Sequence, residues 1–260
     1  MNIVLVGAGR LSTNLGLALH QAGIAVSQVY SRTAESAQRL ANAIGAEATH
    51  HIDSIDRTAD CYIVALTDNA LIELIPTLTR GREDALWVHT AGSIPIDVWK
   101  PYAHHYGVFY PMQTFSLERT VDFSHLPIFI EGGSDDDSRQ LEDLARCLSD
   151  NVRCITSEQR CILHLAAVLV CNFTNHLYDL ADRLLQDHQL PFDVMLPLID
   201  ETAAKVHHLT PHQAQTGPAI RGDTRVINAH LQLLDDYPQL KQLYEQMSEN
   251  IEQQRIANSE

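Results

Sequence analysis

The fold is decided by the stretch Asn2-Ile3-Val4-Leu5-Val6-Gly7-Ala8-Gly9-Arg10-Leu11-Ser12-Thr13-Asn14-Leu15-Gly16. Its apolar start predicts a buried strand, and the apolar residues after Gly9 recur at helical spacing. Glycine at position 7 permits a tight turn, and glycine at position 9 lets bare backbone approach a pyrophosphate that rests on the N–H groups of the helix start. The stretch therefore predicts a dinucleotide site with cofactor contacts from five consecutive residues, Gly7, Ala8, Gly9, Arg10 and Leu11.

Ser12 stands where such turns carry a third glycine. That position serves mainly the close packing of helix on strand, so a small serine, with Gly16 one turn later, should be tolerated. A Gly-x-Gly sequence can also be an ordinary turn. Its place after a strand and before a helix favours the dinucleotide interpretation.

The end of the second expected strand indicates which dinucleotide binds. NAD sites usually place an acid there for the ribose 2′-hydroxyl, whereas NADP sites need a cation and hydroxyl groups for the 2′-phosphate. This chain has Ser31, Arg32 and Thr33, with no acid at the tip. A guanidinium pairs well with phosphate, so we expect NADP(H) as the cofactor. The alternative is a surface arginine followed by a helix cap at Thr33.

Composition restricts the class of protein. With 260 residues, 45% of them hydrophobic, the chain can build an ordinary globular core. No run approaches about 20 uninterrupted apolar residues, so we expect no membrane partner. The formal net charge of -15 would repel nucleic acid. Five cysteines without Cys-x-x-Cys spacing indicate reduced thiols and a cytoplasmic location.

Fourteen histidines suggest a metal site at first sight. Three pairs of them are adjacent in sequence, and adjacent side chains point in different directions on a strand or helix. None shows the i, i+4 spacing beside an acid that helical zinc sites use. We therefore expect no metal.

The order of elements predicts an α/β fold, with an N-terminal Rossmann dinucleotide-binding domain over residues 1–156 and an all-helical domain over 157–260. Strands and helices alternate in the first part, which is typical of a mostly parallel sheet covered on both faces. The strands are expected near 2–6, 25–30, 60–66, 86–89, 107–110, 127–131 and 152–155, and the first helices near 10–22, 33–44, 69–79 and 134–149. The second part shows only helical periods, near 157–187, 191–208, 224–235 and 237–256.

Three loops should follow the carboxyl ends of parallel strands, where ligands of such sheets bind. Polar residues at strand ends are also common in plain turns, so each loop has both interpretations. From these loops we expect cofactor contacts by Leu66, Thr67, Asp68 and Thr90, and substrate contacts by His89, Ser93, Tyr110 and Gln113.

The long helix near 157–187 offers the remaining candidates. His164, Val168, Cys171 and Asn175 form one stripe at α-helical spacing, with Asn172 beside it. The stripe is either a buried polar seam or an active-site face in which His164 donates a proton and Asn172 and Asn175 orient the substrate. Further on, Thr216 and Arg221 lie in a loop with glycine and proline that could hold a substrate carboxylate, or could be a salt-bridged turn.

These residues resemble known families. The Gly-x-Gly turn, Ser31-Arg32-Thr33 and the helical second half are similar to pyrroline-5-carboxylate reductase and other 6-phosphogluconate dehydrogenase-like oxidoreductases. A closer resemblance, over nearly the whole chain, is to a family of Rossmann-like NADP-binding proteins with a C-terminal helical domain of unknown function. It is carried by the segments 89–93, 110–115, 164–167, 172–176 and 216–218.

Two departures limit what the resemblance implies. Hydroxyacid dehydrogenases of this superfamily use a lysine on the first helix of the helical domain, and this chain has none there, so His164 is the expected substitute. Where prephenate dehydrogenase-like enzymes have His-Pro-Met, this chain has Tyr110-Pro111-Met112. We expect an NADPH-dependent reductase of a small C=N or C=O compound that forms a homodimer through its helical domain. The alternative is an NADP-binding sensor or scaffold without catalysis.

Overall fold

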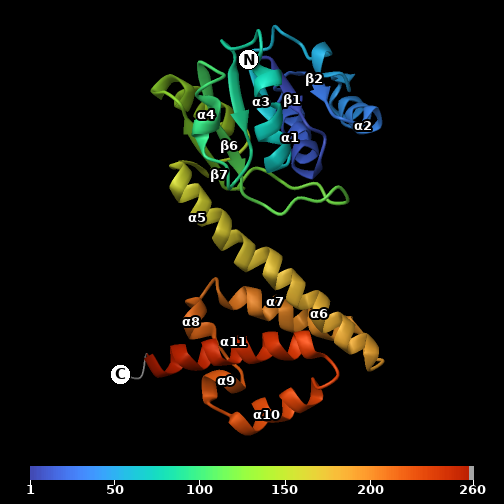
Figure 1. Ribbon diagram of the computed structural model, residues 1–260, viewed down its shortest axis with the longest axis vertical. Coiled ribbons are helices and arrows are strands. Elements are labelled where there is room, and N and C mark those ends of the chain that lie inside the picture. The colour runs from blue at the N-terminus through green and yellow to red at the C-terminus, as the bar shows by residue number, and fades with distance from the viewer. Residues whose placement is uncertain (258–260) are drawn as a thin grey trace. The chain divides into compact units, whose positions relative to one another are not determined.

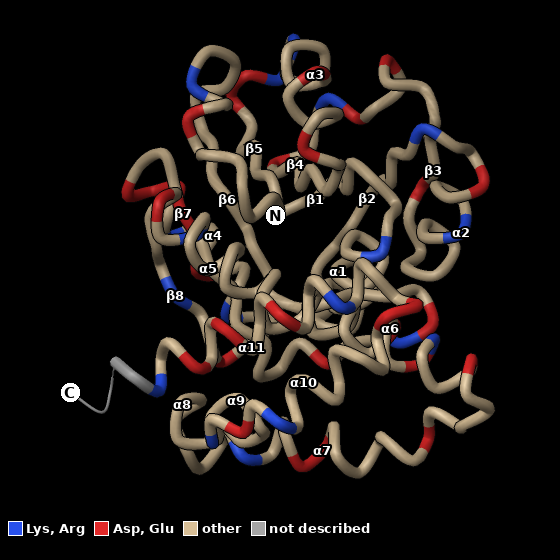
Figure 2. Tube along the Cα trace, turned by 60° about the horizontal axis from the view of Figure 1, so that its bottom comes forward, with Lys and Arg blue, Asp and Glu red and all other residues tan. Residues whose placement is uncertain are grey.

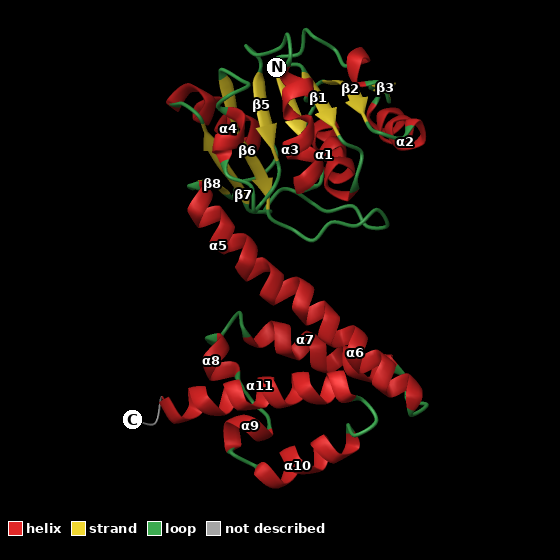
Figure 3. Cartoon of the chain, viewed as in Figure 1, coloured by secondary structure: helices red, strands yellow, loops and turns green. Residues whose placement is uncertain are grey.

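The structure is a computed structural model that describes residues 1–257 (Figure 1). The chain divides into two units, Met1–Cys171 and Asn172–Glu260. The first unit contains the whole sheet, and the second is helical (Figure 3).

An eight-stranded sheet forms the centre of the first unit, in the order β3-β2-β1-β4-β5-β6-β7-β8. All neighbouring strands are parallel except β6 and β7. Val6 is in register with Tyr30 and Val64, and Val64 with His89, so these carboxyl ends lie at one edge. The strands are β1 Ile3–Val6, β2 Val26–Tyr30, β3 Glu47–Thr49, β4 Cys61–Val64, β5 Leu86–His89, β6 His105–Pro111, β7 Ile128–Gly132 and β8 Val152–Cys154.

Helices cover both faces of the sheet because successive strand residues point to opposite sides. Ile3 and Leu5 pack in one buried cluster, whereas Val4 and Val6 pack in another that includes Trp87. The first cluster takes up the apolar sides of α1 (Arg10–Gln21), α2 (Ala34–Ile44) and α4 (Asp135–Arg146), and the second that of α3 (Asp68–Thr79). Short 3₁₀ turns lie at Ile52–Ser54 and Ile96–Trp99.

A continuous helical segment, Ser157–Asp187, follows the sheet. It begins at a capping box in which Thr156 and Gln159 satisfy each other's backbone N–H groups. It consists of α5 (Ser157–Ala167), a π-helical stretch (Val168–Phe173) and α6 (Thr174–Asp187). The π stretch interrupts the α-helical spacing, so the single stripe predicted from His164 to Asn175 does not continue as expected.

By length and composition alone, this segment is the one helix among the described residues that could cross a membrane. Many of its large apolar side chains are exposed, including Ile162, Leu165, Val170 and Phe173. The segment was expected to be a helix of a globular protein, and its exposed apolar surface needs an explanation.

The second unit has few buried side chains of its own. Among its described residues, Ala219 and Leu234 are the buried hydrophobic ones. Acidic and basic residues are interspersed along the trace of the chain (Figure 2). After α6 the elements are a 3₁₀ turn at Phe192–Met195, α7 (Leu196–Lys205), α8 (Pro211–Ala214), α9 (Pro218–Arg221), α10 (Thr224–Leu233) and α11 (Pro238–Ala257).

The predicted α/β Rossmann-like sheet and the helical second part are confirmed. The sheet extends as far as Cys154, so β7 and β8 belong to it. Two features of the sheet were not predicted: the short strand β3 and the antiparallel direction of β7. The division between the units falls inside the long helical segment, at Cys171, and the predicted domain boundary at residue 156 stays a prediction.

Candidate functional site

Gly7 begins the turn between β1 and α1, and its backbone geometry requires glycine. Its φ of +118° lies in the region that other residues rarely adopt. A Cβ at this position would lie 2.4 Å from the carbonyl oxygen of Ala65. The Gly7 N–H donates to the Tyr30 carbonyl at 2.7 Å, and the Gly7 carbonyl accepts from the Ser12 hydroxyl at 2.5 Å. The turn is therefore held by β2, β4 and α1 together.

Gly9 is the N-cap of α1 and has ordinary φ and ψ angles of -80° and -171°. A Cβ built on it would have no atom within 4 Å, so the space above it is open. Since glycine has no side chain to cap the helix, the first N–H groups of α1 stay available to an anion. This open cradle fits the pyrophosphate of a dinucleotide. The cofactor contacts of Gly7, Ala8, Gly9, Arg10 and Leu11 stay predictions.

Gly16 provides the close approach of α1 to the sheet. A Cβ on Gly16 would lie 3.0 Å from Leu5 Cδ1. Ser12 is fully buried. Besides being small enough for this position, it donates a hydrogen bond from its hydroxyl to the Gly7 carbonyl. Ser12, at the position of the third glycine, thus stabilises the turn in this chain.

The end of β2 presents the groups predicted to select NADP. Arg32 and Thr33 are exposed and Ser31 is partly buried. Thr33 occupies the N-cap position of α2, but its hydroxyl makes no capping bond. No ion pair of Arg32 is found within residues 1–257. The guanidinium and the hydroxyl groups are therefore available to a 2′-phosphate.

The loops after β4 and β5 meet at the same edge of the sheet. The Ser93 hydroxyl donates a short hydrogen bond to the Asp68 carboxylate. Thr90 is buried, and its N–H donates to the Val64 carbonyl at 3.2 Å. Leu66 is partly buried, and Thr67 is the N-cap of α3. One predicted cofactor residue, Asp68, thus directly contacts one predicted substrate residue.

His164 is brought to this edge by two contacts within the first unit. Its Nδ1 lies 3.2 Å from the hydroxyl of Tyr110, at the end of β6. Its ring also lies against the backbone of Gly92, where a Cβ would stand 2.6 Å from Nδ1 and 2.7 Å from Cγ. The structure therefore unites the predicted residues His164 and Tyr110 with the loop that carries Ser93.

His89 differs from its prediction as a substrate ligand. Its side chain is fully buried, so it lies beneath the loop and not on its surface. Its Nδ1 accepts the Ala91 N–H at 3.2 Å. Burial, together with the charge of Arg160, lowers its pKa from 6.5 to about 3. His89 is therefore neutral and supports the loop.

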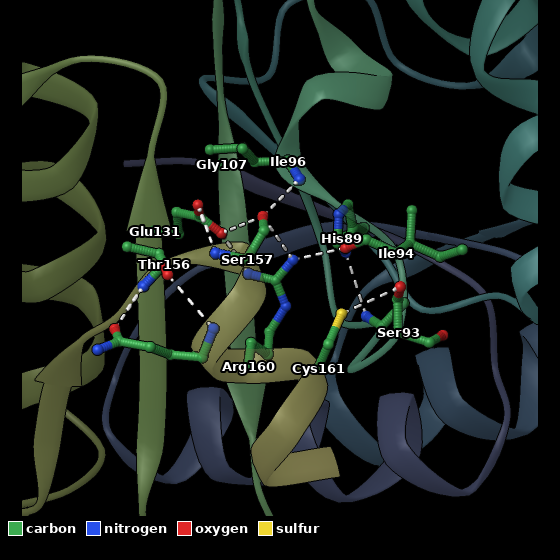
Figure 4. Close-up of polar contacts among 12 residues, drawn as sticks. His89, Ser93, Ile94, Ile96, Gly107, Glu131, Thr156, Ser157, Arg160 and Cys161 are labelled. Carbon is green, nitrogen blue, oxygen red and sulfur yellow. Dashed lines mark hydrogen bonds and ion pairs between the residues drawn. The ribbon is translucent and has the colours of Figure 1, made fainter. Parts of the chain in front are cut away.

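A buried ion pair anchors the start of α5 (Figure 4). Arg160 is 1% exposed and pairs with Glu131 on β7. It also donates to the Ile94 carbonyl at 2.5 Å and to the Ser157 hydroxyl at 3.1 Å. Glu131 in turn accepts the Ser157 N–H at 2.8 Å. The network joins the loop after β5, strand β7 and the helix that carries His164.

Sequence reasoning missed Arg160 and Glu131. The available signal was an arginine one turn before His164 in the same helix. An arginine in a helix is normally interpreted as a surface residue unless an acidic partner is known. The partner, Glu131, lies 29 positions earlier in the chain, so local spacing does not reveal it.

The remaining predicted residues are not brought into this cluster within the first unit. Gln113 is exposed in the segment after β6. Asn172, Asn175, Thr216 and Arg221 are exposed residues of the second unit, so their roles stay predictions. No group of three or more His, Cys, Asp or Glu side chains suited to a metal is found in the described part of the chain.

Two domain descriptions match the sequence: a Rossmann-like domain at residues 1–112 and a domain of unknown function (DUF2520) at residues 126–251. A Bacteroides fragilis protein whose structure bears the name "putative NADP oxidoreductase" is 55% identical, with a TM-score of 0.93, and the match covers 97% of this chain and 98% of that one. A search of the curated proteins gives no match.

More distant structures share the fold. A Thermotoga maritima protein is 21% identical with a TM-score of 0.72, over 99% of this chain and all of that one. An imine reductase from Myxococcus stipitatus, solved with NADP+, is 17% identical with a TM-score of 0.72, over 99% of this chain and 95% of that one.

Proposed function

This chain belongs to the family of the Bacteroides fragilis protein, and from that membership we propose that it is an NADP-dependent oxidoreductase that reduces a C=N or C=O group of a small, carboxylate-bearing compound. The observation that carries the proposal is the pairing of an open dinucleotide cradle at Gly9 with a polar cluster around His164 in the same unit. Both lie in the region after the carboxyl ends of the parallel strands, where ligands of such sheets bind.

Each part of the cofactor has proposed partners in the chain. The pyrophosphate rests on the backbone of Gly7, Ala8 and Gly9, and the 2′-phosphate pairs with Arg32. When bound, NADPH supplies the hydride, so the protein needs only to hold the acceptor carbon and stabilise or protonate the heteroatom. We assign that last task to His164, whose Nε2 has no hydrogen-bond partner among the described residues. Asn172, Asn175 and Arg221 belong to the second unit, and the substrate contacts predicted for them stay predictions.

An imine is the preferred acceptor. An imine nitrogen is more basic than a carbonyl oxygen and is protonated more readily, and this chain has no lysine on α5 to serve as a proton donor. The imine reductase from Myxococcus stipitatus has the same fold, which supports the proposal at the level of architecture alone.

The test is the fall of NADPH absorbance when pure protein is mixed with 2-methyl-1-pyrroline or with a series of 2-oxo acids. Oxidation of NADPH that depends on both protein and probe supports a reductase. The sensor or scaffold is favoured instead if the protein binds NADPH tightly but turns over no probe. This outcome is judged at protein concentrations comparable to that of NADPH.

We also propose that the protein works as a homodimer in the cytoplasm. The second unit has almost no core of its own, and its α6, α10 and α11 form an apolar groove of about 330 Å³ lined by residues such as Leu177, Leu184, Leu233 and Tyr244. Helices that cannot bury their apolar sides within one chain gain stability by packing against a second copy.

Sedimentation or light scattering at micromolar concentration checks this proposal. We expect a dimer, and Leu233→Glu, which places a charge on a side chain that is 74% exposed, should shift it toward the monomer. Glu245→Gln on α11 is the control, since it changes charge without changing that apolar side chain. A wild-type monomer would rule the dimer out, and recovery of the protein only with membranes would rule out the cytoplasmic location.

A further inference from the structure

The hydroxyl of Tyr110 and the imidazole of His164 form a pair whose geometry fixes which ring nitrogen faces a ligand. Tyr110 is 8% exposed and lies in a buried cluster with Ile96, Val108 and Phe129. Within the described residues its hydroxyl has one hydrogen-bond partner, His164 Nδ1 at 3.2 Å. Because a buried O–H without an acceptor is costly, the hydroxyl donates to Nδ1.

The backbone at Gly92 packs closely against the imidazole ring of His164. Gly92 leaves just enough room for the imidazole, because a Cβ there would come within 2.6 Å of Nδ1. The ring thus contacts both the Gly92 backbone and the Tyr110 hydroxyl on its Nδ1 edge. A neutral imidazole that accepts at Nδ1 carries its own proton at Nε2.

We propose that Tyr110 is the positioning residue of His164: it holds the imidazole in the Nε2–H tautomer and replaces the proton that Nε2 gives to the substrate. The proposal rests on the reductase function proposed above. It changes the role of Tyr110 from a substrate ligand to a group that acts through His164.

A neutral C=O or C=N acceptor gains one hydride and one proton in this reaction. NADPH transfers a hydride to the carbon and becomes NADP+, while the π electrons of the double bond move to the heteroatom. The heteroatom takes the proton from Nε2, and Nδ1 takes the proton from the Tyr110 hydroxyl. Water then protonates Nε2 and Nδ1 returns its proton to the phenolate, so His164 regains the Nε2–H tautomer. The acceptor has gained one hydride from NADPH and one proton that water replaces, and hydroxide is released to solvent.

The surroundings of Tyr110 suit this sequence of steps. Burial raises the pKa of its hydroxyl, so the resting group is a phenol that can donate. The positive charge of Arg160 acts in the opposite direction and favours the phenolate that forms briefly. Arg160 is in turn fixed by Glu131 and the Ile94 carbonyl.

The first test needs no substrate. In ¹⁵N-labelled full-length protein at mildly alkaline pH, long-range proton–nitrogen spectra report which ring nitrogen of each histidine is protonated. The His164 signals are identified by their loss in His164→Gln. We expect Nε2–H in the wild type, and loss of the single tautomer in Tyr110→Phe and in Gly92→Ala.

Tyr62→Phe is the matched control. It also removes a phenolic hydroxyl that donates a hydrogen bond, in this case to the Asp56 carbonyl at 2.6 Å, but it lies on β4 away from His164. It should change the melting temperature without changing the His164 signals. A wild-type His164 that carries its proton on Nδ1, or a tautomer that survives in Tyr110→Phe, would overturn the proposal.

The second test measures hydride transfer from NADPH to 2-oxo acids in a single turnover. Tyr110→Phe should slow this step by about 100-fold with NADPH affinity and substrate KM unchanged, because the hydroxyl acts on the proton and not on binding. An unchanged rate would overturn the relay. If the spectra are as expected but the wild type turns over no probe, the reductase function fails while the assigned tautomer stands.

Discussion

The Ser12 hydroxyl donates a 2.5 Å hydrogen bond to the Gly7 carbonyl oxygen, across the turn that opens helix α1. The N–H of Gly7 in turn donates a hydrogen bond to the carbonyl oxygen of Tyr30. Hydrogen bonds thus fix both the N–H and the carbonyl of Gly7. At Gly9, by contrast, a Cβ would have no atom within 4 Å. Gly7 is therefore rigidly held, whereas Gly9, two positions later, faces open space.

That division predicts opposite effects of the same substitution. Gly7→Ala should lower the free energy of unfolding by roughly 1–3 kcal/mol, because the backbone is at φ +118° and the Cβ meets Ala65. Gly9→Ala should leave the melting temperature nearly unchanged and weaken NADPH binding, because its methyl group enters the cradle. Thermal unfolding and fluorescence titration check the pair. Equal effects of the two variants on stability would contradict this account of the turn.

Arg32 should determine the choice between NADPH and NADH. A charged hydrogen-bonded pair with the 2′-phosphate contributes on the order of 1.5–3 kcal/mol, so Arg32→Ala should weaken NADPH binding about tenfold or more and leave NADH binding unchanged. Arg39→Ala on α2 is the control for a general change of charge. Fluorescence titration of both nucleotides is the measurement. Wild-type protein that binds both equally would contradict the assignment.

His164→Ala separates catalysis from stability. If His164 supplies the proton, kcat should fall by about 10²–10⁴-fold with NADPH binding intact. If the imidazole only fills space against Gly92, the variant should instead melt at a lower temperature with unaltered turnover. Both quantities are measured on one variant, and full activity with a lowered melting temperature removes His164 from the mechanism.

His89 should make the stability depend on pH. Its pKa is about 3 in the folded protein against 6.5 for an exposed histidine, so between these values the unfolded chain binds a proton that the folded protein does not. Stability from this group is complete above pH 6.5 and is lost as the pH falls toward 3, by up to about 1.4 kcal/mol per pH unit.

Urea unfolding of His89→Asn as a function of pH tests that sign. Asparagine can still accept the Ala91 N–H, and it does not titrate, so the slope on the acid side should become shallower than in the wild type. The exposed His20→Asn controls for the loss of one histidine. A slope that is unchanged in His89→Asn would show that the buried ring does not cause it.

The parts of the molecule that the sequence predicts correctly are those written in local patterns. The strand, turn and helix around Gly7 and Gly9 follow from apolar runs and glycine spacing within sixteen residues. Strand β3 escapes this reasoning because its three residues are too few to show a period. The direction of β7 escapes it because alternating apolar residues look alike in parallel and antiparallel strands.

The cluster at the candidate site could be predicted only in part. His164 and Tyr110 stand out as polar residues in apolar surroundings, but their contact joins positions 54 apart. The ion pair of Arg160 and Glu131 could not be predicted, because a single sequence contains no signal for a contact between two distant elements. The π-helical stretch at Val168–Phe173 has no known local pattern of composition and displaces the expected stripe.

The absent side chain at Gly92 has a consequence for comparing relatives. The space that a methyl group would occupy is filled by the His164 ring, so the two positions share one volume. A relative with alanine or a larger residue at the position of Gly92 has no room to seat a histidine in the same way. Residues at the two positions should therefore change together, and the pair glycine and histidine would identify those relatives that retain this chemistry.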